Sequence, residues 1–94
     1  MQSGTILLTI EVEDGTRLPG AIATVTSPSL EGSRTVVSNA EGEARIALLP
    51  PGDYELTVTM MGFKTVRESN IMVGIDSVVR RTVVMVPESV EEGL

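Results

Sequence analysis

The stretch Leu49-Pro-Pro-Gly-Asp-Tyr-Glu-Leu-Thr-Val-Thr-Met-Met-Gly-Phe-Lys64 decides the fold. Pro50 and Pro51 end the preceding segment because proline lacks a backbone N–H donor, and Gly52 provides the turn that follows. The next residues then alternate between two faces: Tyr54, Leu56, Val58 and Met60 on one, and Glu55, Thr57, Thr59 and Met61 on the other. A period of two predicts a strand with one buried face and one solvent-exposed face.

The same kind of alternation recurs on both sides of this stretch and predicts a series of short strands. The predicted strands are residues 5–13, 21–26, 34–38, 43–49, 54–61, 64–68, 71–73 and 78–86. Turn signals such as Asp14-Gly15 and Pro19-Gly20 recur about every 8–12 residues, and no segment shows a helical period. We therefore expect an all-β fold, an antiparallel Greek-key β-sandwich of seven or eight strands.

The last predicted strand has two alternative orientations. Two sets of side chains compete for its core face: Val79, Val83 and Met85, or Thr82, Val84 and Val86. The adjacent Arg80 and Arg81 force one arginine to point inward, unless a bulge or the strand end releases it. We favour the orientation in which Val83 and Met85 face the core.

Length and composition limit the size and the class of the protein. A chain of 94 residues forms one domain with one modest core, and aromatic residues are only 2%, so that core must be largely aliphatic. We expect a single domain over residues 1–94, with its core at 4–87 and a frayed acidic tail at 88–94. The net charge of −6 argues against nucleic-acid binding. No apolar run approaches the roughly 20 residues of a membrane helix, so we expect no membrane insertion by this domain.

Residue types that carry most enzyme chemistry are absent. The chain has no His and no Cys, which removes the commonest general base, the commonest metal ligand and any thiol nucleophile. The serine hydroxyls therefore have no histidine to activate them. Glu11, Glu13 and Asp14 form an acidic cluster, but strand alternation places both glutamates on the solvent face. Asn39 and Gly42 are typical of a turn rather than of a calcium loop. We expect no enzyme activity, no metal site and no cofactor.

Four sequence motifs together resemble a known family. In chain order they are Leu18-Pro19-Gly20-Ala21, Ser38-Asn39-Ala40-Glu41-Gly42-Glu43, Leu49-Pro50-Pro51-Gly52-Asp53-Tyr54 and Gly62-Phe63-Lys64. Their order and spacing resemble the carboxypeptidase regulatory-like domain, a transthyretin-like (prealbumin-like) β-sandwich, over residues 4–86. Ala44 is a departure, because the family often has an aromatic residue there.

The resemblance implies an accessory module of a larger secreted or periplasmic, cell-envelope protein. Such domains stand at the N-terminus of TonB-dependent outer-membrane receptors and follow metallocarboxypeptidase catalytic domains. The start at residues 2–5 is similar to a mature N-terminus after signal-peptide removal, so a signal peptide is expected outside this sequence. The expected partners are the rest of the parent polypeptide or another envelope protein. The expected role is protein–protein docking or that of a structural spacer.

A carbohydrate-binding module with a starch-binding-like fold is the alternative. Sugar sites usually rely on exposed aromatic platforms, whereas Tyr54 and Phe63 are expected in the core. For docking, three apolar residues fall on predicted outer faces: Leu7, Ile22 and Met61. Leu7 and Ile22 lie on strands that could be neighbours. Scattered apolar residues are normal on a surface, and the alternative is that the three residues form a docking patch.

Overall fold

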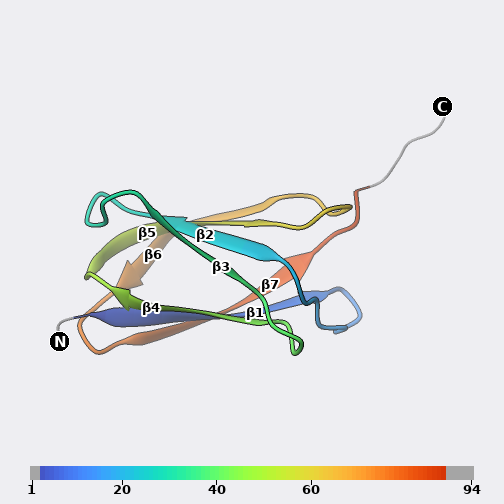
Figure 1. Cartoon of the computed structure of the whole chain (residues 1–94), viewed down its shortest axis with the longest axis horizontal. Helices are drawn as coiled ribbons and strands as arrows, with labels where there is room; N and C mark the ends of the chain where they lie inside the picture. The colour runs from blue at the N-terminus through green and yellow to red at the C-terminus, as the bar shows by residue number, and fades with distance from the viewer. Residues whose placement is uncertain (1–2, 89–94) are drawn as a thin grey trace.

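The computed structural model describes residues 3–88, which form seven strands in two packed sheets (Figure 1). In chain order the strands are β1 (Gly4–Val12), β2 (Ile22–Thr26), β3 (Ser33–Val37), β4 (Glu43–Leu49), β5 (Gly52–Thr59), β6 (Val66–Val73) and β7 (Val78–Met85). None of the described residues lies in a helix long and apolar enough to cross a membrane. The expected all-β sandwich is confirmed.

The strands divide into a three-stranded sheet of order β4-β1-β7 and a four-stranded sheet of order β3-β2-β5-β6. Every pairing is antiparallel except the one between β1 and β7, which is parallel. That pairing runs without interruption from Thr5 opposite Val78 to Val12 opposite Met85. The sequence pattern predicted only antiparallel strands, so the parallel pair is a feature that it missed.

The predicted strands at 64–68 and 71–73 are one strand, β6, interrupted by a β-bulge. Leu56 of β5 pairs with Glu68 and Tyr54 pairs with Ile71, so three residue steps on β6 cover two on β5. Asn70 lies in this bulge with φ 60°, a left-handed conformation that Asn tolerates better than most residues. The bulge explains why Ser69 and Asn70 look like a break in the sequence pattern although the strand continues.

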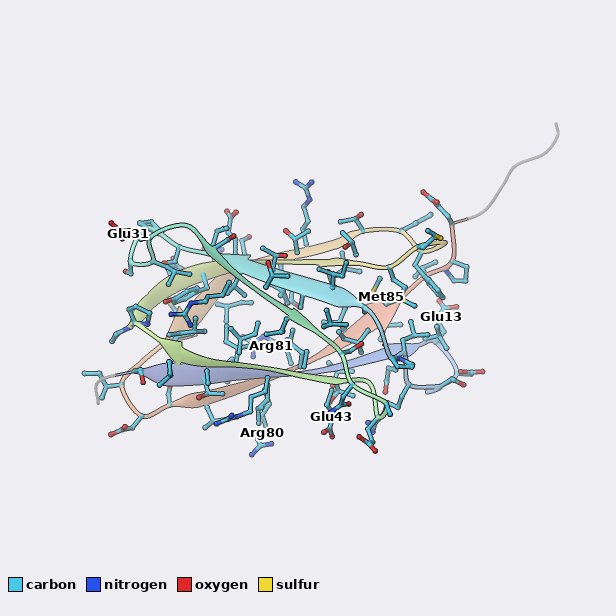
Figure 2. The ribbon with its side chains drawn as sticks, in the orientation of Figure 1. Glu13, Glu31, Glu43, Arg80, Arg81 and Met85 are labelled. Carbon is cyan, nitrogen blue, oxygen red and sulfur yellow. The ribbon has the colours of Figure 1, made fainter. Side chains whose placement is uncertain are left out.

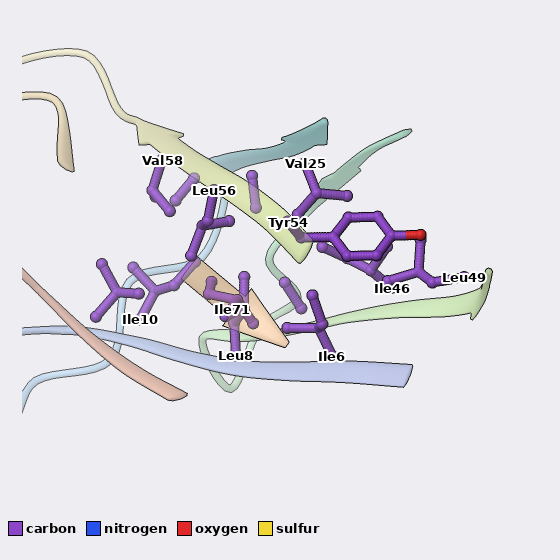
Figure 3. Close-up of a cluster of buried hydrophobic side chains, with 14 of the residues drawn as sticks. Ile6, Leu8, Ile10, Val25, Ile46, Leu49, Tyr54, Leu56, Val58 and Ile71 are labelled. Atoms are coloured by element: carbon purple, nitrogen blue, oxygen red, sulfur yellow. The ribbon is translucent and has the colours of Figure 1, made fainter. Parts of the chain in front are cut away.

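Side chains from both sheets meet in one aliphatic core around Tyr54 (Figure 3). The buried apolar residues are Ile6, Leu8, Ile10, Ala21, Ala23, Val25, Ala44, Ile46, Leu49, Tyr54, Leu56, Val58, Ile71, Val73, Val83 and Met85. Burial of the last two confirms the favoured orientation of the C-terminal strand. Met60, which the alternation placed on the inner face, is only half-buried because β5 already ends at Thr59.

One arginine bridges the two sheets on each open side of the sandwich. On one side, the Nη1 of Arg34 on β3 donates a 3.0 Å hydrogen bond to the carbonyl of Ala47 on β4. On the other side, the Nε of Arg81 on β7 lies 3.7 Å from the Oε1 of Glu68 on β6. Arg81 is therefore the inward member of the arginine pair, and Figure 2 shows it between the sheets while Arg80 points away from them. Inward charges of this kind discourage edge-to-edge pairing with other chains.

Past β7 the chain crosses towards the turn that follows β5. The backbone amide of Lys64 donates to the carbonyl of Val86, and that of Glu88 donates to the carbonyl of Gly62, at 2.8 and 2.9 Å. Glu88, the first residue of the predicted frayed tail, is thus held by a backbone hydrogen bond. The rest of that predicted tail lies outside the described residues.

Candidate docking surface

The outer face of the three-stranded sheet carries a row of two arginines with a leucine between them. Leu7 on the central strand β1 pairs with Arg45 on β4 and with Arg80 on β7. Its chain neighbours Ile6 and Leu8 are buried, so the alternation of side chains turns Leu7 outward. In Figure 2, Arg80 projects from this outer side of the sheet, as does Glu43. The row Arg45–Leu7–Arg80 is the arginine row.

Two exposed apolar residues lie on the strands that flank β1, nearer to its N-terminal end than the arginine row. Val78 pairs with Thr5 on β1 and is 52% exposed. Leu48, at the end of β4, is 58% exposed and lies in a bulge between the pairs Gly4–Leu49 and Ile6–Ile46. Leu48 also has φ 59°, which is uncommon for a leucine because its Cβ crowds the backbone in that region.

A hollow of about 580 Å³ opens over the arginine row. Its lining includes the outward-facing residues Leu7, Thr9, Glu43, Arg45, Arg80 and Thr82. Among residues 3–88, the salt bridges join Arg17 to Glu11 and Arg81 to Glu68, and neither Arg45 nor Arg80 takes part in one. Guanidinium groups stay protonated at physiological pH. The hollow therefore presents two fixed positive charges beside an apolar side chain.

The three residues of the sequence-based docking patch do not lie together. Leu7 lies in this hollow, whereas Ile22 lies on β2 of the other sheet and is 44% exposed. Met61 is 94% exposed and follows β5, which belongs to the sheet of Ile22. Leu7 and Ile22 do not lie on neighbouring strands, because the chain crosses from one sheet to the other between β1 and β2. Alternation assigns a residue to an outer face but not to a particular sheet.

Sequence reasoning missed the two arginines of the row. Arg45 lies at an outward-facing position of a strand that was predicted correctly at 43–49. The alternation of side chains along that strand already indicated that Arg45 faces outward. The orientation favoured for the last strand likewise turned Arg80 outward. Only the pairing of β4 and β7 on either side of β1 brings the two residues to the same hollow.

A second hollow of about 450 Å³, lined mostly by polar residues, lies at the bulged end of β5 and β6. Its lining residues are Thr26, Ser27, Pro28, Asp53, Tyr54, Glu55, Ser69 and Asn70. Asp53 and Glu55 bring two carboxylates to it, but residues 3–88 contain no group of three or more acidic, His or Cys side chains arranged to hold a metal ion. The lining also lacks an exposed aromatic ring, because Tyr54 is fully buried. The hollow has none of the platforms on which sugars usually stack.

Three of the residues that were weighed as cation ligands, Glu11, Asp14 and Asn39, have structural partners. Glu11 forms a 3.5 Å salt bridge with Arg17. The Oδ1 of Asp14 accepts a 2.9 Å hydrogen bond from the amide of Thr16, and this bond lowers the pKa of the carboxyl group. The Oδ1 of Asn39 accepts hydrogen bonds from the amides of Glu41 and Glu43, both at 3.0 Å. The interpretation of this segment as a turn is confirmed.

The fold defines a class, that of small β-sandwich modules, and comparison with known sequences identifies the family. The family model of the carboxypeptidase regulatory-like domain matches residues 5–86, and the chain belongs to this family. The chain is also 40% identical, over 93 residues, to the TonB-dependent transporter Oar of Myxococcus xanthus. The match covers 97% of this chain but only 9% of the transporter.

Solved structures share the same fold. The TIE protein of Bacillus anthracis aligns with a TM-score of 0.79 and 18% identity, over 92% of this chain and 17% of its own. A streptococcal ancillary pilin aligns with a TM-score of 0.73 and 21% identity, over 93% of this chain and 33% of its own. At these identities the likeness concerns the fold alone. In each case the chain spans a minor part of the larger protein, as in the transporter.

Proposed function

We propose that the chain is a non-catalytic accessory module and acts as a structural spacer within a larger cell-envelope protein. The observation that carries this proposal is the parallel pairing of β1 with β7. Because the first and last strands run side by side in the same direction, the chain enters the sandwich at one end and leaves it at the other. An antiparallel pair would bring both connections to the same end.

The separation between the two ends follows from the register. Eight residues from Thr5 to Val12 are paired with eight from Val78 to Met85, and strands rise by about 3.3 Å per residue. The entry and exit points are therefore at least ~23 Å apart, the length of seven such steps. A domain with this geometry adds its own length to a chain in which it is inserted, without bending that chain back.

The family context supports the same role. The domain accounts for a small part of a much longer transporter in the relative from Myxococcus xanthus, as expected for a module set in series with other parts. Location in the cell envelope is proposed on the same ground.

The test is a domain replacement in the full-length protein that carries this domain. One variant replaces it with an unrelated sandwich whose termini lie at opposite ends, and a matched variant uses a sandwich of similar size whose termini lie at the same end. The quantity measured is the amount of folded, active parent protein in the envelope fraction. The opposite-end replacement should preserve it, and the same-end replacement or a deletion should reduce it. Equal performance of the two replacements would contradict a spacer role.

A further inference from the structure

Beyond the spacer role, we propose that the arginine row is a docking site for an extended, acidic segment of a partner protein. The partner segment presents two carboxylates on either side of an apolar side chain. The carboxylates meet Arg45 and Arg80, and the apolar side chain packs on Leu7, which lies between them in register. Residues Leu48 and Val78 extend the apolar contact beyond the row.

Charge complementarity selects the partner. The whole chain has a net charge of −6, yet three of its seven basic residues line this hollow. Arg81 pairs with Glu68, whereas Arg45 and Arg80 form no salt bridge within residues 3–88. Neighbouring strands lie about 4.8 Å apart, so the Cα atoms of Arg45 and Arg80 are separated by roughly 10 Å across β1. Arginine binds carboxylates through paired N–H groups, so two such pairs also fix the register of the bound segment.

A narrow polypeptide fits this hollow better than an anionic membrane surface does. Glu43 lines the same hollow and points to the same outer side as Arg80 (Figure 2). A flat anionic surface would cover Glu43 together with the arginines and would also face the excess negative charge of the chain. A single extended segment can place its carboxylates on the two arginines, and its hydroxyl or backbone N–H groups can donate to Glu43.

The backbone of Leu48 provides independent support. A leucine at φ 59° is strained, and the side chain of Leu48 is more than half exposed. Strained residues persist only where the surrounding structure holds them in place, and they cluster at active sites, ligand clamps and switch regions. The bulge leaves an apolar side chain exposed three residues after Arg45 on β4, outside the hollow itself, where a bound segment that extends past the row would cover it.

The experiment measures binding of a synthetic peptide with the central sequence Glu-Ser-Leu-Ser-Glu by fluorescence anisotropy. In an extended peptide these two Glu side chains and the Leu side chain point to the same side. Arg45→Gln and Arg80→Gln should each weaken binding about tenfold, the loss expected for one charged hydrogen-bonded pair of about 1.4 kcal/mol. Arg67→Gln, an exposed arginine on β6 of the other sheet, is the matched control and should leave the affinity unchanged.

Two further measurements separate this site from general electrostatic attraction. A peptide with Gln in place of both Glu residues should not bind, and the affinity for the acidic peptide should fall as salt is raised. Leu48→Gly should weaken binding without lowering the melting temperature, because glycine relieves the backbone strain.

Three results would each overturn the proposal. The first is no binding of the acidic peptide up to millimolar concentration, and the second is a loss of affinity in Arg67→Gln equal to that in the two row variants. The third is that Arg45→Gln and Arg80→Gln abolish binding to anionic phosphatidylglycerol vesicles but leave peptide binding unaffected. Each variant is checked by its circular dichroism spectrum and thermal melt. A failure of this proposal leaves the spacer role intact, because the spacer role depends on the β1–β7 pairing and not on these side chains.

Discussion

The hydroxyl of Tyr54 donates a 2.6 Å hydrogen bond to the backbone carbonyl of Pro50, four residues earlier in the chain. The ring of Tyr54 is fully buried among aliphatic residues of both sheets (Figure 3). One side chain thus fills the core and also fixes the Pro-Pro-Gly turn through which the chain passes from β4 in one sheet to β5 in the other. A tyrosine can do both because its ring is apolar and its tip is polar.

This double role predicts an order of stability among three variants. Tyr54→Ala should lower the free energy of unfolding by about 3–5 kcal/mol because it removes a buried aromatic ring. Tyr54→Phe should cost about 1 kcal/mol, the value of one hydrogen bond. Thr57→Ala, on the outer face of the same strand, should cost least. Urea melts measure all three, and a loss for Thr57→Ala as large as that for Tyr54→Ala would show that the assigned inner face of β5 is wrong.

The same tyrosine predicts a dependence of stability on alkaline pH. Burial raises the pKa of the Tyr54 hydroxyl, and the positive charge of Arg34 only partly opposes this effect. Below the ordinary tyrosine pKa of about 10 the group is neutral in both states. Above it the unfolded chain loses the proton first, so the unfolded state binds fewer protons and the free energy of unfolding falls as pH rises.

Urea melts between pH 8 and 11.5 test this dependence, with the Tyr54→Phe variant as the control because it lacks the titrating group. The slope attributable to Tyr54 stays below about 1.4 kcal/mol per pH unit, the limit set by one titrating proton. Identical slopes for the two proteins would refute the prediction.

Gly42 is predicted to be far less replaceable than Gly62, although both have positive φ angles of 75° and 87°. A Cβ at position 42 would lie 2.7 Å from the carbonyl oxygen of Ile10 and 2.8 Å from the Cβ of Arg17. A Cβ at position 62 meets nothing within 4 Å. Gly62→Ala should cost about 1–2 kcal/mol for backbone strain alone, and Gly42→Ala about 2–5 kcal/mol once crowding is added. Chemical denaturation measures both, and equal losses would contradict the crowding argument.

The ion pair of Glu68 and Arg81 should contribute modestly to stability and depend on salt. Both side chains are about two-fifths exposed, so solvent screens their attraction. However, the Oε1 atom of Glu68 is itself buried and has no hydrogen bond within the described chain. Arg81→Met should therefore cost about 1 kcal/mol, and adding Glu68→Met should recover part of that loss. A double-mutant cycle at low and high salt measures the coupling, and strictly additive losses would contradict it.

Resistance to mechanical force should depend on its direction. Force applied at Ser3 and Glu88 shears all the β1–β7 hydrogen bonds together because those strands are parallel. Force applied at Glu13 and Glu88 acts at the same end of both strands and opens the bonds one after another. The chain has no native Cys, so pairs of engineered cysteines define each pulling geometry uniquely. In single-molecule experiments the first geometry should require a several-fold higher unfolding force, and equal forces would argue against shear of this pair.

Much of this architecture could be read from local patterns. Strand 43–49 was predicted with its observed ends, and the other boundaries moved by at most two residues, apart from the two short strands that merge into β6. The core positions of Tyr54, Leu56, Val83 and Met85 also follow from alternation. A period of two in polarity depends on neighbouring residues only, so the chain itself carries that information.

The candidate docking surface could not be predicted as a unit. Alternation placed Leu7 outward correctly, but it grouped this residue with Ile22 and Met61, which belong with the other sheet. The real neighbours of Leu7 are Arg45 and Arg80, which are 38 and 73 positions later in the chain.

The sequence by itself thus determined the strands, the turns and the face that each strand turns to the core. The tertiary structure alone decided which strands pair, that β1 and β7 run parallel, and that Arg45 and Arg80 flank Leu7. The physical reason is that strand pairing joins backbone groups of residues far apart in the chain, and these groups are chemically alike on every strand. Their choice of partner follows from how all the buried side chains pack together, which no local pattern contains.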